Sequence, residues 1–202
     1  MTAFPGRPAV FLDRDGTINE EYGYLNHVSR IRLIPGVGRA IRRLNAAGLP
    51  VIVVSNQAGV AHGYFPEINL ELCEARLVEL LARHDAHIDA FYYCPFHPQA
   101  KLERYRVDSP LRKPRPGMLD KAAAEHDIDL SRSYMAGDRP SDMECARSRG
   151  LKALFLRTGY GEGEWTWHRD QWKVQPDLIS RTLSQAVTWI LNDLKKTQRP
   201  TG

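Results

Sequence analysis

Two carboxylates lie two residues apart directly after a short apolar run of the chain. Asp13 and Asp15 flank Arg14 and follow residues 9–12, which we predict to form a buried strand. Side chains repeat every second position along an extended chain, so both carboxylates can enter one site. Such a pair can bind a divalent cation or serve as nucleophile and general acid and base, although a turn alone also accounts for it. The residues around the pair therefore decide between these interpretations.

Other polar residues follow later apolar runs in the same way. Ser55 and Asn56 come at the end of the second predicted strand, Asp138 and Asp142 follow the fourth, and Lys113 ends a long irregular stretch. Open α/β sheets bind ligands at the carboxyl ends of their strands. The sequence therefore predicts that these side chains share one crevice with the first two carboxylates.

The combined set of residue types suits phosphoryl transfer. A phosphate group needs its negative oxygens neutralised by a cation, a lysine and a hydroxyl or backbone donor before it reacts readily. Asp13, Asp138 and a backbone carbonyl near Asp15 offer the hard oxygen ligands that magnesium prefers. We therefore predict a magnesium site in which one carboxylate of the first pair is the nucleophile and the other is the general acid and base.

Apolar runs and amphipathic stretches alternate along the chain, which is typical of βαβ units. Helices are expected between the strands, opened by Pro35, Pro66 and Pro116, and an amphipathic helix is expected near the C-terminus. The pattern predicts an α/β protein with a three-layer, Rossmann-like fold and a mostly parallel sheet. We predict its strands at residues 9–12, 49–54, 90–93, 133–136 and 151–156.

The chain has 202 residues, of which 43% are hydrophobic and 26% are charged. This length and composition suit a single compact domain over residues 1–202. Two stretches interrupt the alternation of strands and helices, at about 95–116 and 158–176. Long loops in a compact domain are commonly functional or disordered, so we expect loop insertions at both places, next to the crevice.

Composition and charge argue against several other classes of protein. The longest apolar runs, such as residues 51–54, fall far short of the roughly 18 residues of a membrane helix, and residues 1–8 lack the apolar core of a secretory signal. The three cysteines form no C-x-x-C pair, and the net charge of +4 comes without a basic run. We therefore expect a cytoplasmic monomer that takes a small anionic ligand and contacts neither nucleic acid nor membrane.

The motifs, in their order, resemble the haloacid dehalogenase superfamily of phosphatases, and they span nearly the whole chain. The matching segments are Asp13-Arg14-Asp15-Gly16-Thr17, Ser55-Asn56, Lys113, and Gly137-Asp138 with Asp142. More narrowly, the chain is similar to the D-glycero-D-manno-heptose 1,7-bisphosphate 7-phosphatases and their histidinol-phosphate phosphatase relatives. The segments that carry this similarity are Asn19 to Tyr24, Ser55 to Val60, Tyr93-Cys94-Pro95, His97-Pro98, Arg112-Lys113-Pro114 and Pro116-Gly117-Met118.

The resemblance implies a role for each of these residues. Asp13 would be the nucleophile, and Asp15 would protonate the leaving oxygen and then activate water. Ser55 and Lys113 would be catalytic phosphate clamps, and Asp142 would orient Lys113 or the waters of the metal. The implied magnesium ligands are Asp13, Asp15 through its carbonyl, and Asp138. The residues implied to bind substrate are Glu21, Tyr22, Gly23, Tyr24, Ser55, Asn56, Gln57, Ala58, Arg112, Lys113 and Arg139.

The chain departs from the relatives where they commonly hold a structural zinc. Cys94 is present, but Phe96 stands at the usual histidine position and Ser109 and Leu111 stand at the usual cysteine positions. A closed zinc site needs four ligands, so we predict no structural zinc. Aromatic packing is expected to order the stretch instead, through Tyr93, Phe96 and Tyr105. His62 also replaces an arginine that often follows the second motif.

The leading interpretation is a magnesium-dependent phosphatase that acts on a small phosphosugar through an aspartyl-phosphate intermediate. The resemblance favours the 7-phosphate of D-glycero-D-manno-heptose 1,7-bisphosphate, and histidinol phosphate is the alternative substrate. A phosphomutase or phosphotransferase is disfavoured, because no cap is long enough to exclude water during transfer. A catalytically inactive protein that binds a phosphate ligand is the alternative from another class. The paired carboxylates argue against it, since they would repel a polyanion.

Overall fold

A six-stranded sheet forms the centre of the computed structural model, which describes residue 4 and residues 6–197. Every neighbouring pair of strands runs parallel, in the order β3-β2-β1-β4-β5-β6. Five strands confirm the prediction to within two residues at their ends, and β6 was not predicted because only two of its residues, Leu178 and Ile179, are apolar. The strands are β1 (Val10–Leu12), β2 (Val51–Asn56), β3 (Ala90–Cys94), β4 (Tyr134–Gly137), β5 (Lys152–Leu156) and β6 (Leu178–Ser180).

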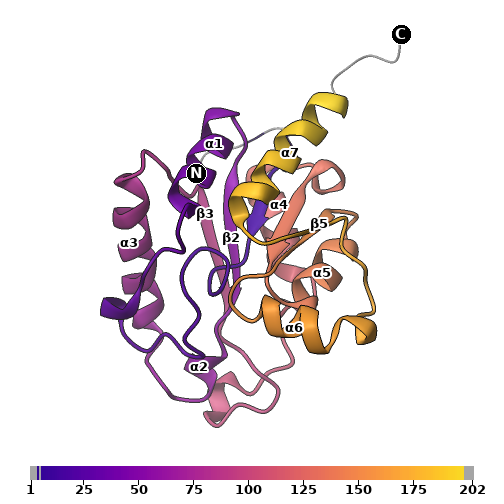
Figure 1. Cartoon of the computed structure of the whole chain (residues 1–202). Coiled ribbons are helices and arrows are strands. Elements are labelled where there is room, and N and C mark those ends of the chain that lie inside the picture. The colour runs from indigo at the N-terminus through magenta and orange to yellow at the C-terminus, as the bar shows by residue number, and fades with distance from the viewer. Residues whose placement is uncertain (1–3, 5, 198–202) are drawn as a thin grey trace.

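Helices cover both faces of this sheet, as Figure 1 shows. The longer helices are α1 (Val37–Ala46), α3 (Ile68–Ala82), α4 (Gly117–His126), α5 (Pro140–Arg147), α6 (Gly161–Trp167) and α7 (Leu183–Thr197), and α2 (Ala58–Ala61) is a single turn. Short 3-10 turns lie at Val28–Arg30, Glu103–Tyr105, Leu130–Arg132 and Arg169–Gln171. Within the described residues, no helix combines the length and the apolar character that crossing a membrane requires.

Alternate residues of each strand feed two separate hydrophobic clusters. Val10 and Leu12 of β1 pack in the cluster beneath α1, α3 and α7, whereas Phe11 packs in the cluster beneath α4 and α5. All three side chains are fully buried. Burial on both faces explains why these strands appear in the sequence as continuous apolar runs. The three-layer, Rossmann-like fold is therefore confirmed.

The strand order reverses beside β1, and this reversal fixes the place of the site. The chain passes from β1 outward to β2 and β3, then returns to β4 on the other side of β1. Leu12, the last residue of β1, pairs with Val53 on one side and Ala136 on the other. Crossover connections leave a crevice at such a reversal, outside the carboxyl ends of the strands. Asp13 and Asp138 directly follow those ends.

The two predicted loop insertions differ in structure. Residues 95–116 are irregular apart from one 3-10 turn, and Tyr105 packs there in a third hydrophobic cluster with Phe96 and Tyr93 against it. The predicted aromatic packing of this stretch is thus confirmed. Residues 158–176 are not simply a loop, since they contain α6 and a 3-10 turn. Its apolar side chains account for this difference, because Trp165 and Trp172 pack against the second cluster and hold the segment on the sheet.

Candidate active site

A buried lysine joins three parts of the fold at the carboxyl end of β1. Lys113 Nζ lies 2.7 Å from Asp13 Oδ1, 2.8 Å from the carbonyl oxygen of Val54 in β2, and 2.7 Å from Asp142 Oδ1 in α5. The backbone of Lys113 is held as well, since Asn56 exchanges two hydrogen bonds with it, each 3.0 Å long. The predicted pairing of Lys113 with Asp142 is therefore observed.

The charges of these groups decide their protonation. Burial lowers the pKa of Lys113, but the charges of Asp13 and Asp142 outweigh burial and raise it, so this lysine stays a cation. Burial raises the pKa of Asp13 to about 6 against the opposing effect of Lys113, with Asp142 adding to the rise. Asp13 is therefore ionised at neutral pH, as a nucleophilic carboxylate must be.

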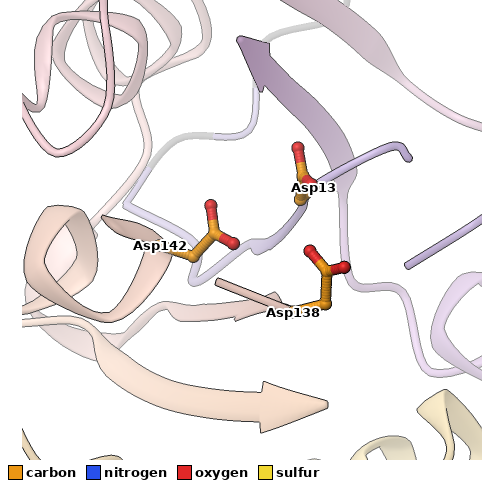
Figure 2. A group of neighbouring side chains, drawn as sticks. All are labelled: Asp13, Asp138 and Asp142. Carbon is orange, nitrogen blue, oxygen red and sulfur yellow. The ribbon is translucent and has the colours of Figure 1, made fainter. Parts of the chain in front are cut away.

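Three carboxylates converge beside this lysine. Oxygens of Asp13, Asp138 and Asp142 all lie within 4.8 Å of one another, and Figure 2 shows the three side chains grouped together. Asp138 is fully buried, and its Oδ1 has no hydrogen-bond partner among the residues that the structure describes. Burial and the charges of Asp13 and Asp142 raise the pKa of Asp138 to about 8. An unpartnered carboxylate oxygen among like charges fits a hard divalent cation such as magnesium.

Asp15 faces the same cavity but is held by a different set of donors. Arg14 donates to both of its oxygens, at 3.1 and 2.7 Å, and Asn19 and Gln57 donate to it at 2.9 and 2.8 Å. Gln57 also donates to Ser55 Oγ at 2.8 Å. Burial raises the pKa of Asp15, but Arg14 and these hydrogen bonds outweigh burial and lower it. Asp15 is therefore held as a carboxylate, the form that can accept a proton.

Two glycines allow the loop after β5 to approach the carboxylates. A Cβ on Gly16 or on Gly159 would lie 2.2 or 2.3 Å from Asp138 Oδ2, and both glycines have positive φ, +77° and +51°. The backbone N–H of Tyr160 donates to that same oxygen at 2.7 Å, and Thr158 Oγ1 donates to the carbonyl of Gly16 at 2.5 Å. Only residues without a side chain fit where these two loops meet.

A cavity of about 380 Å³ opens above these groups. Of the predicted residues, it is lined by Asp13, Asp15, Glu21, Gly23, Tyr24, Ser55, Asn56, Gln57, Ala58, Arg112, Lys113, Arg139 and Asp142. Tyr22 is the exception among the predicted substrate residues, because its hydroxyl donates to Glu20 and its ring lies against Arg30 outside the cavity. Consecutive residues of this loop point in different directions, so a motif match alone could not distinguish them.

Four polar residues of the cavity were not predicted from the sequence as site residues: His62, His97, Ser141 and Tyr160. His97 Nδ1 accepts a hydrogen bond of 3.0 Å from the backbone N–H of Gln99, so in the neutral ring the proton is on Nε2. Burial, Arg112 and His62 lower the pKa of His97, which keeps the ring neutral. Tyr160 follows β5 at the same edge of the sheet as the other site residues, and this position was the available signal.

Two arginines line the cavity without a carboxylate partner. Neither Arg112 nor Arg139 forms an ion pair within the part of the chain that the structure describes, and the hydrogen bond from Arg112 to the Phe96 carbonyl is long, at 3.4 Å. Burial lowers the pKa of Arg112, and the positive charge of Arg139 contributes to the same direction. Two unpaired guanidinium groups at one cavity suit an anionic ligand with more than one charged group.

Comparison with known proteins agrees with this geometry. Residues 110–186 match a family model described as HAD-hydrolase-like, and that segment contains Lys113, Asp138 and Asp142. The chain is 43% identical over 196 positions to the D-glycero-D-manno-heptose-1,7-bisphosphate 7-phosphatase of Thermosynechococcus vestitus, covering 93% of this chain and 97% of the relative. It is 39% identical over 202 positions to the D-glycero-beta-D-manno-heptose-1,7-bisphosphate 7-phosphatase of Escherichia coli K12, covering 96% of each chain.

Solved structures agree as well. A HAD-like phosphatase from Mesorhizobium loti superposes with a TM-score of 0.82 at 32% identity, over 100% of this chain and 92% of that one. The D,D-heptose 1,7-bisphosphate phosphatase from B. bronchiseptica, solved with magnesium and phosphate, also has a TM-score of 0.82, at 26% identity over 92% of this chain and 99% of that one. The fold and the site thus define a haloacid dehalogenase-like hydrolase. Within that class, the chain belongs to the heptose 1,7-bisphosphate 7-phosphatase family.

Proposed function

We propose that this chain is a magnesium-dependent phosphatase that removes the 7-phosphate of D-glycero-D-manno-heptose 1,7-bisphosphate. The observation that carries the proposal is the position of Asp13 in the cavity, where its carboxylate contacts the Lys113 ammonium and lies close to the carboxylates of Asp138 and Asp142. A phosphoryl group above Asp13 would meet a nucleophile, a cation and a metal site together. The relatives named for this substrate supply its identity.

The reaction would begin with attack of an Asp13 oxygen on phosphorus. The bond from phosphorus to the sugar oxygen breaks, and Asp15 donates a proton to that oxygen as the sugar leaves. Arg14 lowers the pKa of Asp15, and the negative charge of the phosphoryl group next to Asp15 would raise it. The bound substrate would therefore favour the protonated form of Asp15. Asp15, now a carboxylate held by Arg14, then takes a proton from water as the water oxygen attacks the aspartyl-phosphate. Inorganic phosphate is released and both carboxyl groups are restored.

Three groups would hold the magnesium ion: Asp13, the backbone carbonyl of Asp15, and Asp138. The ion would neutralise charge on the phosphoryl oxygens. Lys113 balances the charge of Asp13 from the other side, and Asp142 holds this lysine in place. Ser55 would donate its hydroxyl to a phosphoryl oxygen, because Gln57 already donates to Ser55 and leaves that hydroxyl proton free for the ligand.

The remainder of the substrate would lie against the upper part of the cavity. Arg112 is placed to bind the second phosphate, because a guanidinium binds phosphate through two parallel hydrogen bonds. Glu21, half-buried, has its pKa raised to about 7 by burial and the charge of Asp15. Close to neutrality it can accept or donate a hydrogen bond to a sugar hydroxyl. These contacts would favour a phosphosugar over a simple phosphate ester.

We also propose that the chain works as a cytoplasmic monomer without a structural zinc. The absence of a basic run gives no reason to expect a nucleic-acid partner. Phe96 and Leu111, which stand where zinc ligands would be needed, pack against the second hydrophobic cluster. Tyr105 adds a hydrogen bond of 2.8 Å to Glu67, which anchors the stretch to the residue before α3.

The test is steady-state release of phosphate with magnesium across a panel of substrates: both anomers of the heptose bisphosphate, fructose 1,6-bisphosphate, histidinol phosphate and an aryl phosphate. We expect the highest kcat/KM for a heptose bisphosphate and none for any substrate in the Asp13→Asn variant. A higher kcat/KM for histidinol phosphate would replace the proposed substrate with the alternative one.

A further inference from the structure

The loop after β5 places in the cavity a tyrosine that belongs to none of the sequence motifs. Tyr160 lines the cavity, and the guanidinium carbon of Arg139 lies 3.8 Å from the centre of its ring. This is the shortest of the cation–π distances in the described part of the chain. Arg139 has no ion pair there, so the tyrosine ring is the group that orients its guanidinium.

The backbone of Tyr160 is held by one of the carboxylates proposed to bind the metal. The backbone N–H of Tyr160 donates to Asp138 Oδ2, and Thr158 two residues earlier donates to the carbonyl of Gly16. A second cavity of about 490 Å³, between Tyr160 and the segment of Ile34 and Pro35, lies on its other side. Tyr160 is therefore a wall between two cavities, and without the ring Arg139 would have a larger space to occupy.

The charges around Arg139 indicate what it faces. Arg139 and Arg112 line the same cavity, and the positive charge of Arg139 contributes, after burial, to the lowered pKa of Arg112. Glu21 also lines this cavity, and the charge of Arg139 opposes the rise in its pKa, but the two form no ion pair in the described part of the chain. Two like charges held near one another, one by an aromatic platform, fit an anion that lies between them.

We propose that Tyr160 is a positioning residue, whose ring holds Arg139 so that Arg139 and Arg112 together bind the second, non-reacting phosphate of the substrate. This inference rests on the proposed function only in its requirement for a bisphosphate. The tyrosine hydroxyl is not needed for this role, since the aromatic face alone attracts the cation. The ring, by contrast, cannot be replaced by an aliphatic side chain of similar volume.

The experiment compares Tyr160→Phe with Tyr160→Leu, alone and combined with Arg139→Ala. Heptose bisphosphate, fructose 1,6-bisphosphate and an aryl phosphate are used as substrates, and each bisphosphate is also measured as an inhibitor of aryl phosphate hydrolysis. Tyr160→Phe should behave as the wild type. Tyr160→Leu should raise KM and the inhibition constant for bisphosphates by roughly two- to thirtyfold, the range expected for a lost cation–π contact, with kcat and aryl phosphate hydrolysis nearly unchanged.

The combined variant separates positioning from a structural effect. If Tyr160 acts through Arg139, adding Tyr160→Leu to Arg139→Ala changes nothing further. Arg104→Ala is the matched control, because Arg104 also lies against a tyrosine, 4.9 Å from the ring centre of Tyr105, but outside the cavity. Additive effects of the two changes, or an equal loss in Tyr160→Phe, would overturn the proposal. If the wild type binds fructose 1,6-bisphosphate but not the heptose bisphosphate, the proposed substrate is wrong. The coupling between Tyr160 and Arg139 can then still be measured with fructose 1,6-bisphosphate.

Discussion

At the scale of single residues, the site separates the chemistry of the reacting phosphate from recognition of the rest of the substrate. Asp13 and Lys113 lie at the floor of the cavity, buried and joined by a hydrogen bond of 2.7 Å. Arg112 is half-buried at the wall and has no carboxylate partner in the described chain. Groups with such different surroundings should respond differently to substitution, and two predictions use that difference.

The first prediction concerns the nucleophile. Asp13→Asn should abolish turnover, because the amide can neither attack phosphorus nor neutralise a cation. We expect at least a ~10⁴-fold loss of kcat, since enzymes of this kind accelerate reactions by ~10⁶-fold or more. Phosphate release and the circular dichroism spectrum are the measurements. A variant that retains about a hundredth of the activity with an intact fold would contradict the assignment of Asp13.

The second prediction contrasts neighbouring residues. Arg112→Ala should lower kcat/KM for the bisphosphate by about ten- to hundredfold, the equivalent of losing a charge-assisted hydrogen bond. It should leave hydrolysis of an aryl phosphate nearly whole, because that substrate has no second phosphate. Lys113→Ala should depress hydrolysis of both substrates, since Lys113 balances the charge of Asp13. Equal losses for the two variants on both substrates would show that the two residues form one phosphate clamp.

At the scale of elements, the loops at the carboxyl ends of β1 and β5 must meet closely for Asp138 to keep its position. This contact leads to a third prediction, for Gly159→Ala. The added Cβ would lie 2.3 Å from Asp138 Oδ2 and 2.5 Å from Gly16 Cα, at a φ of +51°. We expect a loss of stability of about 1–3 kcal/mol from strain and a disproportionate loss of kcat, as Asp138 is displaced.

A glycine in the next helix supplies the control for that substitution. Gly163 lies in α6, and a Cβ there meets no atom within 4 Å. Gly163→Ala should therefore leave kcat unchanged, with stability equal or slightly higher because alanine favours the helix. Urea unfolding and steady-state kinetics on both variants provide the comparison. Normal activity in Gly159→Ala would mean that the loop after β5 tolerates movement. The interpretation that this loop holds Asp138 in position would then be wrong.

The last helix is held on the sheet by a partly buried polar contact, which gives a fourth prediction. Asp193 of α7 accepts hydrogen bonds from Tyr134 of β4, at 2.7 Å, and from Lys152 of β5. Burial raises the pKa of Asp193, but the bonds from Lys152 and Tyr134 outweigh burial and lower it. A carboxyl group with a lowered pKa in the folded state stabilises the fold above its unfolded pKa, near 4, and this contribution is lost as pH falls further.

Asp193→Asn should therefore destabilise the protein at pH 7 by on the order of 1 kcal/mol. The difference from the wild type should shrink as the pH is lowered below about 4. Urea unfolding at pH 7 and pH 3 measures both effects. Asp170→Asn is the control, because the Asp170 side chain is 95% exposed and should contribute little. A difference that stays constant with pH would show that the ionised form of Asp193 is not what stabilises α7.

At the scale of the whole molecule, the fold should not depend on metal although the reaction does. Three carboxylates converge beside the cavity, and the stretch 95–116 packs through Tyr105 and Phe96 into the third hydrophobic cluster. We predict that EDTA stops phosphate release, that magnesium restores it, and that the melting temperature falls by no more than a few degrees on chelation. Metal analysis of the purified protein tests whether zinc is bound. One zinc tightly bound per chain, with unfolding on its removal, would overturn the zinc-free proposal.

Five of the six strands and the main residues of the site could be predicted from the sequence alone. Strands buried on both faces must be continuous apolar runs, so five of them could be located from the apolar pattern alone. A parallel sheet then delivers the residues that follow those strands to one edge. Asp13, Ser55 and Asp138 could therefore be grouped into one site from their positions in the sequence.

Only the tertiary structure decided which side chains form the walls of the cavity. Tyr22 and Tyr24 are two residues apart in one loop, yet Tyr24 lines the cavity and Tyr22 lies outside it. Loop side chains follow local turns and long-range packing rather than a fixed period, so no spacing rule predicts their direction. The position of Tyr160 in the cavity could not be predicted from the sequence for the same reason. It depends on Gly16 and Gly159, which are distant in sequence but in contact in the fold.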